Sequence, residues 1–432
     1  MKGPPEAARL TTEGVSPAVR HHEVMARALL ILPTGTYRAA DFMEAAAALD
    51  AHVIVASEED MVLADQLGDD FLLIDCSRPE ESARRIVQLG DRQPLDAIVP
   101  VDDQGVLIAA LAAEMLGLTH NPPAAVAATR NKVMLRRALA GGEIPQPAFE
   151  LAGPPDDVGG LAEVVGYPVV LKPLSMSASR GVIRADNADE ARVAAERIRR
   201  ILAVAGDNPG EPILIEQYVP GIELAVEGVM RGGSLEVLAF FDKPDPLEGP
   251  FFEESLFVTP SRLHPEMLDE VERVTARAVR TIGLREGPVH AELRVDGSRV
   301  VFLEAAARSI GGLCGRSLRF GLLGTPLEVV LLRHALGHPL RKIRREDPAS
   351  GVMMLPIPRA GIFRGVHGSE RALEVPGITE LEITIPLERR VWPLPEADRY
   401  LGFLFARGQT PEDVERALRQ GFSCLDVVID TD

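Results

Sequence analysis

Short apolar runs alternate with amphipathic stretches between residues 26 and 120. The expected strands cover residues 28–33, 52–57, 71–76 and 96–101, and the expected helices cover residues 39–49 and 106–117. Strands that alternate with helices in this way are typical of a doubly wound parallel sheet. A turn over residues 33–36 (PTGT) follows the first strand, in place of a G-x-G-x-x-G fingerprint. A dinucleotide-dependent dehydrogenase is therefore disfavoured.

The pattern changes at residues 121–123 (NPP), where two prolines interrupt the chain. Predicted helices over 123–129 and 131–140 come next, and mixed strands and helices continue to about residue 340. Short strands then dominate, with one helix that Thr410 caps and Pro411 opens. We expect a loose tail over 1–25, a Rossmann-like domain over 26–120, a central domain over 121–340 and a C-terminal domain over 341–432.

Charge and composition narrow the class of protein. The 432 residues carry 46 Lys plus Arg against 64 Asp plus Glu, and a net charge of −18 argues against nucleic acid or an anionic membrane as partner. No run of 18 uncharged apolar residues exists, and the first 25 residues lack the apolar core of a signal peptide. The cysteines, Cys76, Cys314 and Cys424, form no disulfide framework. We expect a cytoplasmic protein.

Lysine is scarce in this chain. Arginine supplies the other basic residues, and the five lysines are Lys2, Lys132, Lys172, Lys243 and Lys342. Lysine is a compact charge on a flexible stem, whereas arginine is a wide planar fork. Lys2 lies in the predicted tail and Lys342 lies in a basic surface run, so these two lysines need no functional explanation. The three internal lysines are candidates for a site that needs a slim, mobile ammonium group.

Lys172 ends an apolar strand over 168–172, and a loop of small residues follows it. The loop includes Ser175, Ser177, Ser179 and Gly181. Small side chains let successive backbone N–H groups approach an anion, and a neighbouring lysine adds charge for phosphate oxygens. For this segment taken alone, an ordinary turn is the simpler interpretation.

A second segment combines an apolar strand with a hinge and acids. The strand over 212–217 runs into Glu216, Gln217, Tyr218 and Val219, and a break at 220–221 precedes Glu223. Backbone groups of such a linker can hold adenine, and the acid beyond it can take ribose hydroxyls. A loop with solvated acids is the alternative.

A hairpin at residues 296–298 (DGS) joins two apolar strands, and each strand carries one acid, Glu292 or Glu304. Facing each other, the two carboxylates would form a magnesium site. A two-residue turn at residues 296–297 would pair Glu292 with Val301 and put the two acids on opposite faces. A three-residue loop would pair Glu292 with Phe302 and leave both on one face, so the metal interpretation predicts that loop.

Arg308 follows Glu304 by four residues, and its fork could clamp a reacting phosphoryl group. Together these elements resemble the ATP-grasp superfamily over roughly residues 25 to 425. The resemblance implies ATP contacts at Lys132, Lys172, Ser175, Ser177, Ser179, Gly181, Glu216, Gln217, Tyr218, Val219 and Glu223, and Mg²⁺ (alternatively Mn²⁺) on Glu292 and Glu304. Two departures from the family pattern are Ala306 in place of an asparagine and a phosphate loop with one glycine.

Residues 240–260, 356–361 and 400–403 are similar to carboxylate–amine ligases of the L-amino-acid ligase type. The resemblance implies an α/β and α+β ATP-grasp fold, with a doubly wound N-terminal domain and a small β-rich C-terminal domain that closes over the site. Arg308 and Lys243 become the catalytic candidates. The substrate candidates are Glu253, Glu254, His290, Gly311, Gly312 and Arg316; for His290 a structural role is the alternative.

The implied reaction joins a small-molecule carboxylate to an amine through an acyl phosphate. One alternative is a bicarbonate-using ligase of the purine or biotin-carboxylase type. The other is a non-catalytic nucleotide-binding module, and its best support is Ala306 at the position of the family's asparagine. Either a monomer or a homodimer fits the sequence.

The substitution Lys172→Arg tests whether this position requires a lysine, because it keeps the positive charge and changes the shape of the side chain. We expect most ATP turnover to be lost because the guanidinium is too wide for the phosphate position. ADP release under saturating substrates is the measurement. Full activity in the variant would mean that the scarcity of lysine is a coincidence.

Overall fold

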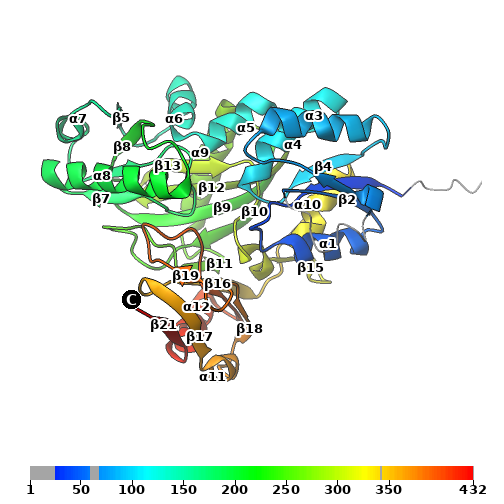
Figure 1. Cartoon of the computed structure of the whole chain (residues 1–432). Coiled ribbons are helices and arrows are strands. Elements are labelled where there is room, and N and C mark those ends of the chain that lie inside the picture. Colours follow the sequence, from blue (N-terminus) through cyan, green and yellow to red (C-terminus); the bar gives the residue numbers. More distant parts are fainter. Residues whose placement is uncertain (1–24, 59–67, 341–342, 432) are drawn as a thin grey trace, which may run out of the picture.

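A computed structural model describes residues 25–58, 68–340 and 343–431 (Figure 1). The chain forms an N-terminal region, a central region with a projecting lobe, and a C-terminal region. One long sheet runs through the central and C-terminal regions. The predicted tail, apart from Met25, lies outside the described residues.

The N-terminal region is the predicted doubly wound sheet. Its strand order is β3-β2-β1-β4, and each pair of neighbours is parallel. In β1, Leu29 and Ile31 enter one buried cluster while Leu30 enters another, so both faces of the sheet are covered and the strand is apolar after Arg27. The elements are β1 (Arg27–Ile31), α1 (Ala39–Ala48), β2 (His52–Ser57), β3 (Phe71–Leu73), α3 (Pro79–Gly90), β4 (Ala97–Pro100) and α4 (Asp103–Leu116).

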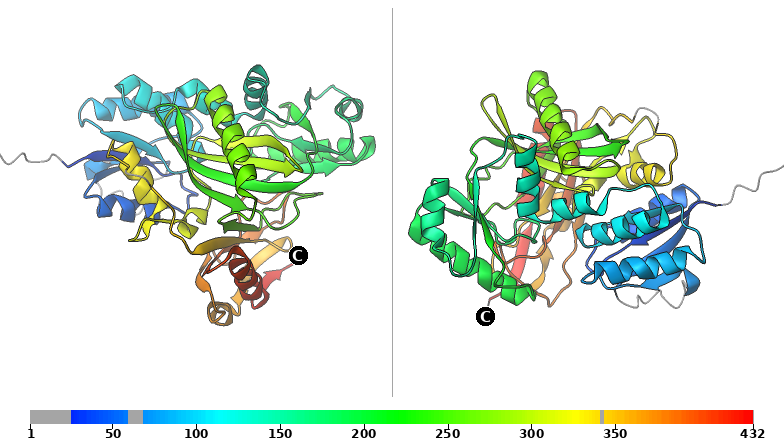
Figure 2. Two further views of the ribbon diagram at one scale, coloured as in Figure 1. Left: turned by 180° about the vertical axis from the view of Figure 1, so that it is seen from behind. Right: turned by 90° about the horizontal axis from the view of Figure 1, so that it is seen from above.

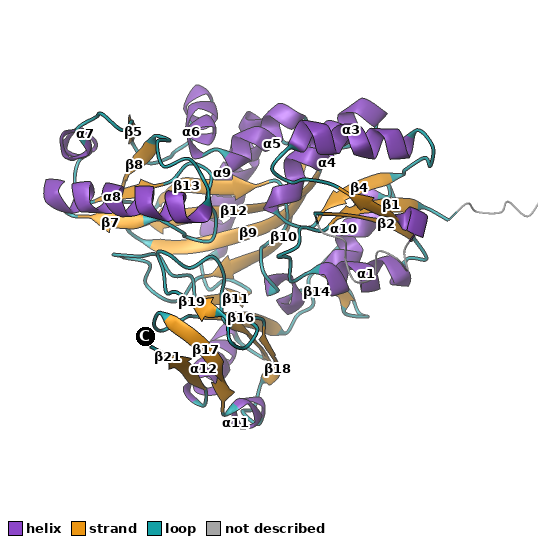
Figure 3. Ribbon diagram, viewed as in Figure 1, coloured by secondary structure: helices purple, strands orange, loops and turns teal. Residues whose placement is uncertain are grey.

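The projecting lobe is a second, antiparallel sheet of order β5-β8-β6-β7, packed against α7 and α8 (Figure 3). Helix α8 buries an apolar stripe that includes Ala191, Ala195, Ile198 and Leu202, the spacing of an amphipathic helix on a core. The elements are β5 (Phe149–Ala152), α7 (Val158–Val165), β6 (Val169–Lys172), β7 (Ile183–Ala185), α8 (Ala188–Ala205) and β8 (Ile213–Gln217).

The long sheet has eight antiparallel strands in the order β13-β12-β9-β10-β11-β16-β20-β18. Strand β11 pairs directly with β16, so the boundary predicted at residue 340 does not separate two sheets. Its strands are β9 (Ile222–Arg231), β10 (Ser234–Asp242), β11 (Leu256–Thr259), β12 (Gly287–Asp296), β13 (Arg299–Ala306), β16 (Ala349–Leu355), β18 (Ile378–Ile383) and β20 (Gly402–Gly408). Helix α9 (Pro265–Ile282) lies across one face of this sheet (Figure 2).

The remaining elements flank this sheet. The predicted cap of the last helix is present, since Thr410 Oγ1 accepts a hydrogen bond from the Asp413 N–H at 3.2 Å. No helix among the described residues is long and apolar enough to cross a membrane. These elements are α5 (Pro123–Arg130), α6 (Lys132–Gly141), β14 (Arg319–Phe320), β15 (Thr325–Pro326), α10 (Leu327–Ala335), β17 (Gly361–His367), α11 (Ser369–Leu373), β19 (Arg390–Val391), α12 (Pro411–Ser423) and β21 (Asp426–Asp430).

The β12–β13 hairpin corrects one prediction. Asp296 pairs with Arg299, so the loop has two residues and not the expected three. Strand β13 contains a bulge at Leu303, and this extra residue pairs Glu292 directly with Glu304. Without the bulge, the second acid would point to the opposite face of the sheet. The two acids therefore share a face as the metal interpretation requires, but the bulge is the cause.

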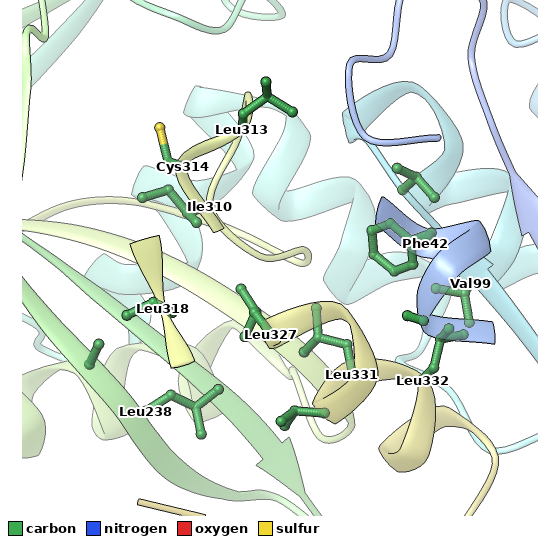
Figure 4. Packing of buried hydrophobic residues seen from close by; sticks show 14 of the residues in the cluster. Phe42, Val99, Leu238, Ile310, Leu313, Cys314, Leu318, Leu327, Leu331 and Leu332 are labelled. Atoms are coloured by element: carbon green, nitrogen blue, oxygen red, sulfur yellow. The ribbon is translucent and has the colours of Figure 1, made fainter. Parts of the chain in front are cut away.

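Buried side chains join the N-terminal region to the central region (Figure 4). Phe42 of α1 and Val99 of β4 belong to the same cluster as Leu238 of β10 and Leu331 of α10. Arg38, just before α1, crosses the same interface with 1% of its surface exposed. The interface is therefore part of the core, and it holds the N-terminal region in a set position.

Arg38 generates a stability prediction. Its guanidinium donates to Glu328 Oε1 at 3.0 Å and to Ser309 Oγ at 2.9 Å, and Glu328 is also buried. Arg38→Met would leave a buried carboxylate without its cation, so we expect the free energy of unfolding to fall by about 3–5 kcal/mol in urea titrations. Arg78→Met, on the exposed surface, is the matched control and should leave the transition unchanged. Equal midpoints for the Arg38 variant and the wild type would contradict this assignment.

Candidate functional site

A cavity of about 690 Å³ opens where the N-terminal region, the lobe, the long sheet and the C-terminal region meet. This volume lies within the range of small-molecule sites. It brings together most of the predicted site residues. Those that line it are Lys132, Lys172, Ser175, Ser177, Ser179, Glu216, Gln217, Tyr218, Val219, Glu223, Glu254, His290, Glu292, Glu304, Arg308, Gly311 and Gly312.

Two lysines and the serine loop form one end of the cavity. Asn131 caps α6, since its Oδ1 accepts hydrogen bonds from the Val133 and Met134 N–H groups at 3.1 Å each, and this places Lys132 in the first turn. The Lys132 ammonium donates to the Met176 carbonyl at 2.6 Å, and Lys172 Nζ lies 2.7 Å from Glu216 Oε2. Gly181 does not line the cavity, and its N–H donates to the Pro395 carbonyl at 3.0 Å. The loop therefore presents serines and two ammonium groups, which suit an anionic ligand.

The predicted adenine hinge lies beside these lysines, but one of its side chains has another use. Burial would raise the pKa of Glu216, yet Arg136 and Lys172 outweigh burial and lower the pKa to about 2. This carboxylate is therefore an anion that holds two cations. Arg294 donates to the Val219 carbonyl at 2.7 Å and to Glu223 at 2.8 Å. An arginine that the sequence analysis did not single out therefore holds the hinge backbone through a hydrogen bond.

Lys243 is the clearest correction among the catalytic candidates. Its ammonium donates to Glu223 at 2.8 Å, to Glu254 at 2.6 Å and to Glu292 at 2.9 Å. An ammonium has three donors, so all of them are used. The side chain is 3% exposed and does not line the cavity. Lys243 therefore neutralises a carboxylate cluster and has no donor free for a reaction intermediate.

The carboxylates fit a magnesium ion. Oxygens of Glu223, Glu254 and Glu292 lie within 4.8 Å of one another, but the Lys243 ammonium already binds all three acids. Glu304 faces Glu292 across the hairpin, so Glu292 and Glu304 form the donor pair for a metal. Mg²⁺ prefers carboxylate oxygens together with phosphate oxygens and water, so this donor set suits it. Lys243 and His290 both contact Oε1 of Glu292, at 2.9 and 3.4 Å, so Oε2 is the oxygen they leave for a metal.

His290 is held between two acids. Its Nδ1 lies 3.2 Å from Glu227 Oε2, and Glu227 also accepts the Ile310 N–H at 3.0 Å. Burial alone would lower the pKa of His290, but the hydrogen bonds of Glu227 and Glu292 raise it to about 9. The imidazole is therefore protonated at neutral pH and cannot take a proton from an amine. The structure favours the structural role for this residue.

Arg308 also lines the cavity. Its guanidinium donates to Asp103 Oδ2 at 2.7 Å and to the Ser309 carbonyl at 2.9 Å. Burial opposes the charge, but Asp103 raises the pKa of Arg308 above its usual range. Arg316 does not line the cavity; it pairs with Asp41 at 2.9 Å and also with Glu380. The predicted role of Arg316 in holding a substrate carboxylate is therefore wrong.

The two neighbouring acids of the β10–β11 connection take different places. Glu254 lines the main cavity, and burial, followed by the charge of Glu292, raises its pKa to about 8. Glu253 lines a smaller adjoining cavity with Ala178 and Leu394. Only the first of these acids can meet a ligand in the main cavity.

Several lining residues were missed by the sequence analysis. Asp103 follows β4 at the carboxyl edge of the parallel sheet, where ligands of such folds bind, so its position was a usable signal. Arg294 lies only two residues from Glu292 on a strand already under study. Tyr400 comes from the C-terminal region, in a segment that the resemblance covered without giving it a role in the site.

Three family models match the chain in succession. They are an ATP-grasp N-terminal domain over residues 43–120, an ATP-grasp domain over 165–317, and L-amino acid ligase C-terminal domain 2 over 353–430. Their order agrees with the regions of the structure.

Known proteins show the same relationship. The chain is 27% identical over 389 residues to carnosine synthase 1 of Gallus gallus, which covers 84% of this chain and 42% of that protein. It is 25% identical over 255 residues to alanine–anticapsin ligase of Bacillus subtilis, covering 55% of this chain and 53% of that protein. The chain thus spans about half the length of these curated relatives.

The fold is similar to that of an L-amino acid ligase from Bacillus licheniformis, with a TM-score of 0.77 and 23% identity. The match covers 94% of this chain and 99% of that one. The chain therefore contains ATP-grasp domains followed by an L-amino acid ligase C-terminal domain, and the proteins it resembles include a carnosine synthase, an alanine–anticapsin ligase and an L-amino acid ligase.

Proposed function

We propose that this protein is an ATP-dependent carboxylate–amine ligase that forms an amide bond, with an amino acid as one substrate. One observation carries the proposal: a single cavity is lined by two lysines, a facing pair of acids and Arg308. Phosphates, metal and reacting acyl group thus have adjacent places. The L-amino acid ligase domain at the C-terminus favours this reaction over bicarbonate chemistry.

ATP would place its adenine at the hinge of residues 217–219 and its phosphates between Lys132 and Lys172. Glu292 and Glu304 are the proposed ligands of Mg²⁺, with Mn²⁺ as the alternative. Magnesium, when bound there, would offset negative charge on the phosphate oxygens. Glu223 keeps its proposed ribose contact, although Lys243 and Arg294 already bind its oxygens.

The reaction would proceed in two balanced steps. A substrate carboxylate attacks the γ-phosphorus of ATP, giving an acyl phosphate and ADP. The amine then attacks the acyl carbon, and phosphate and a proton leave as the amide forms. Arg308 would hold the acyl phosphate through its fork, while the loop over 175–181 keeps water from the intermediate. We include a cytoplasmic location, small-molecule partners and a homodimer in this proposal.

A non-catalytic nucleotide-binding module is the second candidate, because Ala306 replaces the usual asparagine beside the metal-binding acids. It would bind ATP but turn over none of it. The carboxylate pair and both lysines remain in place, so we favour the enzyme.

The ligase proposal predicts ADP release that depends on a pair of substrates. We expect phosphate release with some pair of amino acids, and a new amide of the summed mass less water in the mass spectrum. Glu304→Gln should lower this rate by at least about 100-fold, since it removes a metal ligand. Glu163→Gln, on the lobe surface, is the matched control. ATP binding without turnover across the whole panel would support the module instead.

The protonated His290 should make the stability of the fold depend on pH. Its folded pKa of about 9 lies above the ordinary value of 6.5, so its charge stabilises the protein fully below pH 6.5. This stabilisation should fall as the pH rises and vanish above about pH 9. Melting temperatures of wild type and His290→Gln should therefore differ most at pH 6 and converge at pH 10. The exposed His338→Gln should show no such trend; a constant difference for the His290 variant would refute the assignment.

A further inference from the structure

Lys243 occupies a position among three carboxylates that a metal ion could otherwise take. Its ammonium donates to Glu223 at 2.8 Å, to Glu254 at 2.6 Å and to Glu292 at 2.9 Å. Oxygens of these acids lie within 4.8 Å of one another, close enough to share one cation. Calcium binds carboxylate oxygens at about 2.3–2.6 Å, so a divalent ion of that size would fit in place of the ammonium after small shifts of the oxygens.

Neighbouring strands of the long sheet fix the ammonium in this position. Lys243 follows β10 directly, and its N–H donates to the Glu223 carbonyl of β9 at 3.3 Å. Glu292 lies on β12, which pairs with the other edge of β9. The ring centroid of Phe257 lies 5.1 Å from the ammonium, within the range of a cation–π contact. The ammonium is therefore enclosed by the fold, and a divalent ion cannot bind these three acids while it is there.

The remaining metal ligands on this face of the hairpin are few. Lys243 and His290 both contact Oε1 of Glu292, which leaves Oε2, and Glu304 faces Glu292 from β13. Ala306 lies two residues beyond Glu304 on the same face and lines the cavity, but its methyl group has no ligand atom. Mg²⁺ commonly binds one or two carboxylates together with phosphate oxygens and water, so this donor set suits one ion.

We propose that Lys243 takes the place of a second metal ion, so that this protein binds one divalent ion with each ATP. The ammonium supplies a fixed positive charge next to Glu292, and the single ion on Glu292 and Glu304 bridges the phosphate oxygens. Lys243 is a positioning residue that holds Glu292 through Oε1 and determines the number of ions. This inference rests on the proposed ligase function and assigns the metal content of its site.

The number of bound ions tests the inference directly. Mn²⁺ accepts the same oxygen ligands as Mg²⁺, and the EPR signal of free Mn²⁺ gives the number bound. Wild-type protein saturated with a non-hydrolysable ATP analogue should bind one Mn²⁺ per chain. Lys243→Met vacates the position among the three carboxylates and should bind two. Two ions in wild type, or equal numbers in wild type and variant, would overturn the inference.

Thermal stability without nucleotide is a second measurement. Lys243→Met leaves three buried acids without their shared cation, so its melting temperature should fall in the absence of metal. Millimolar Mn²⁺ should restore the melting temperature, because an ion that binds the folded state stabilises it. Arg38→Met is the matched control: it also leaves a buried acid, Glu328, without its cation, but a lone carboxylate should give no recovery in Mn²⁺. Equal recovery in both variants would contradict a specific ion position.

A charge-matched double variant keeps the test possible if Lys243→Met does not fold. Lys243→Met combined with Glu254→Gln removes one charge of each sign, and Glu223 and Glu292 remain to bind the second Mn²⁺. These counts need no amide formation, so they are independent of the ligase reaction. One ion in wild type and two in the variant, in a protein that forms no amide, would keep the assignment of Lys243 and reject the ligase. An active ligase with equal counts in both proteins would do the reverse.

Discussion

The burial of carboxylate charge at the centre of the long sheet is the constraint on which the site depends. Glu223, Glu227 and Glu292 are buried, and anions removed from water need cations close by. Lys243, His290 and Arg294 supply them from neighbouring strands. Lys132, Lys172 and Arg308 lie outside this cluster and line the same cavity.

The long sheet continues from the central region into the C-terminal region. Since β11 pairs with β16, the C-terminal region extends the same sheet that carries the acids. The N-terminal region is held through a shared core and Arg38. Residues from every region can therefore keep defined distances within one cavity. The proposed reaction requires such fixed distances, because phosphate, acyl group and amine must be aligned.

Much of the site could be predicted because it follows from local signals. A strand that ends in Lys172, a serine loop and a hairpin with one acid on each strand are all visible in the sequence. The errors concern partners that lie far away along the chain. Lys243 was expected to meet a reaction intermediate but meets three acids, and Arg316 was expected to hold a substrate but meets Asp41, 275 residues away.

The sequence alone determined the kinds of element, since the spacing of apolar residues reports which face of a helix or strand is buried. It also determined which residue types could handle phosphate and metal. Only the tertiary structure decided which of them remain available. One bulge at Leu303 turns Glu304 toward Glu292, and three acids use every donor of Lys243. Register and hydrogen-bond partners depend on contacts between distant segments, and those contacts exist only once the chain has folded.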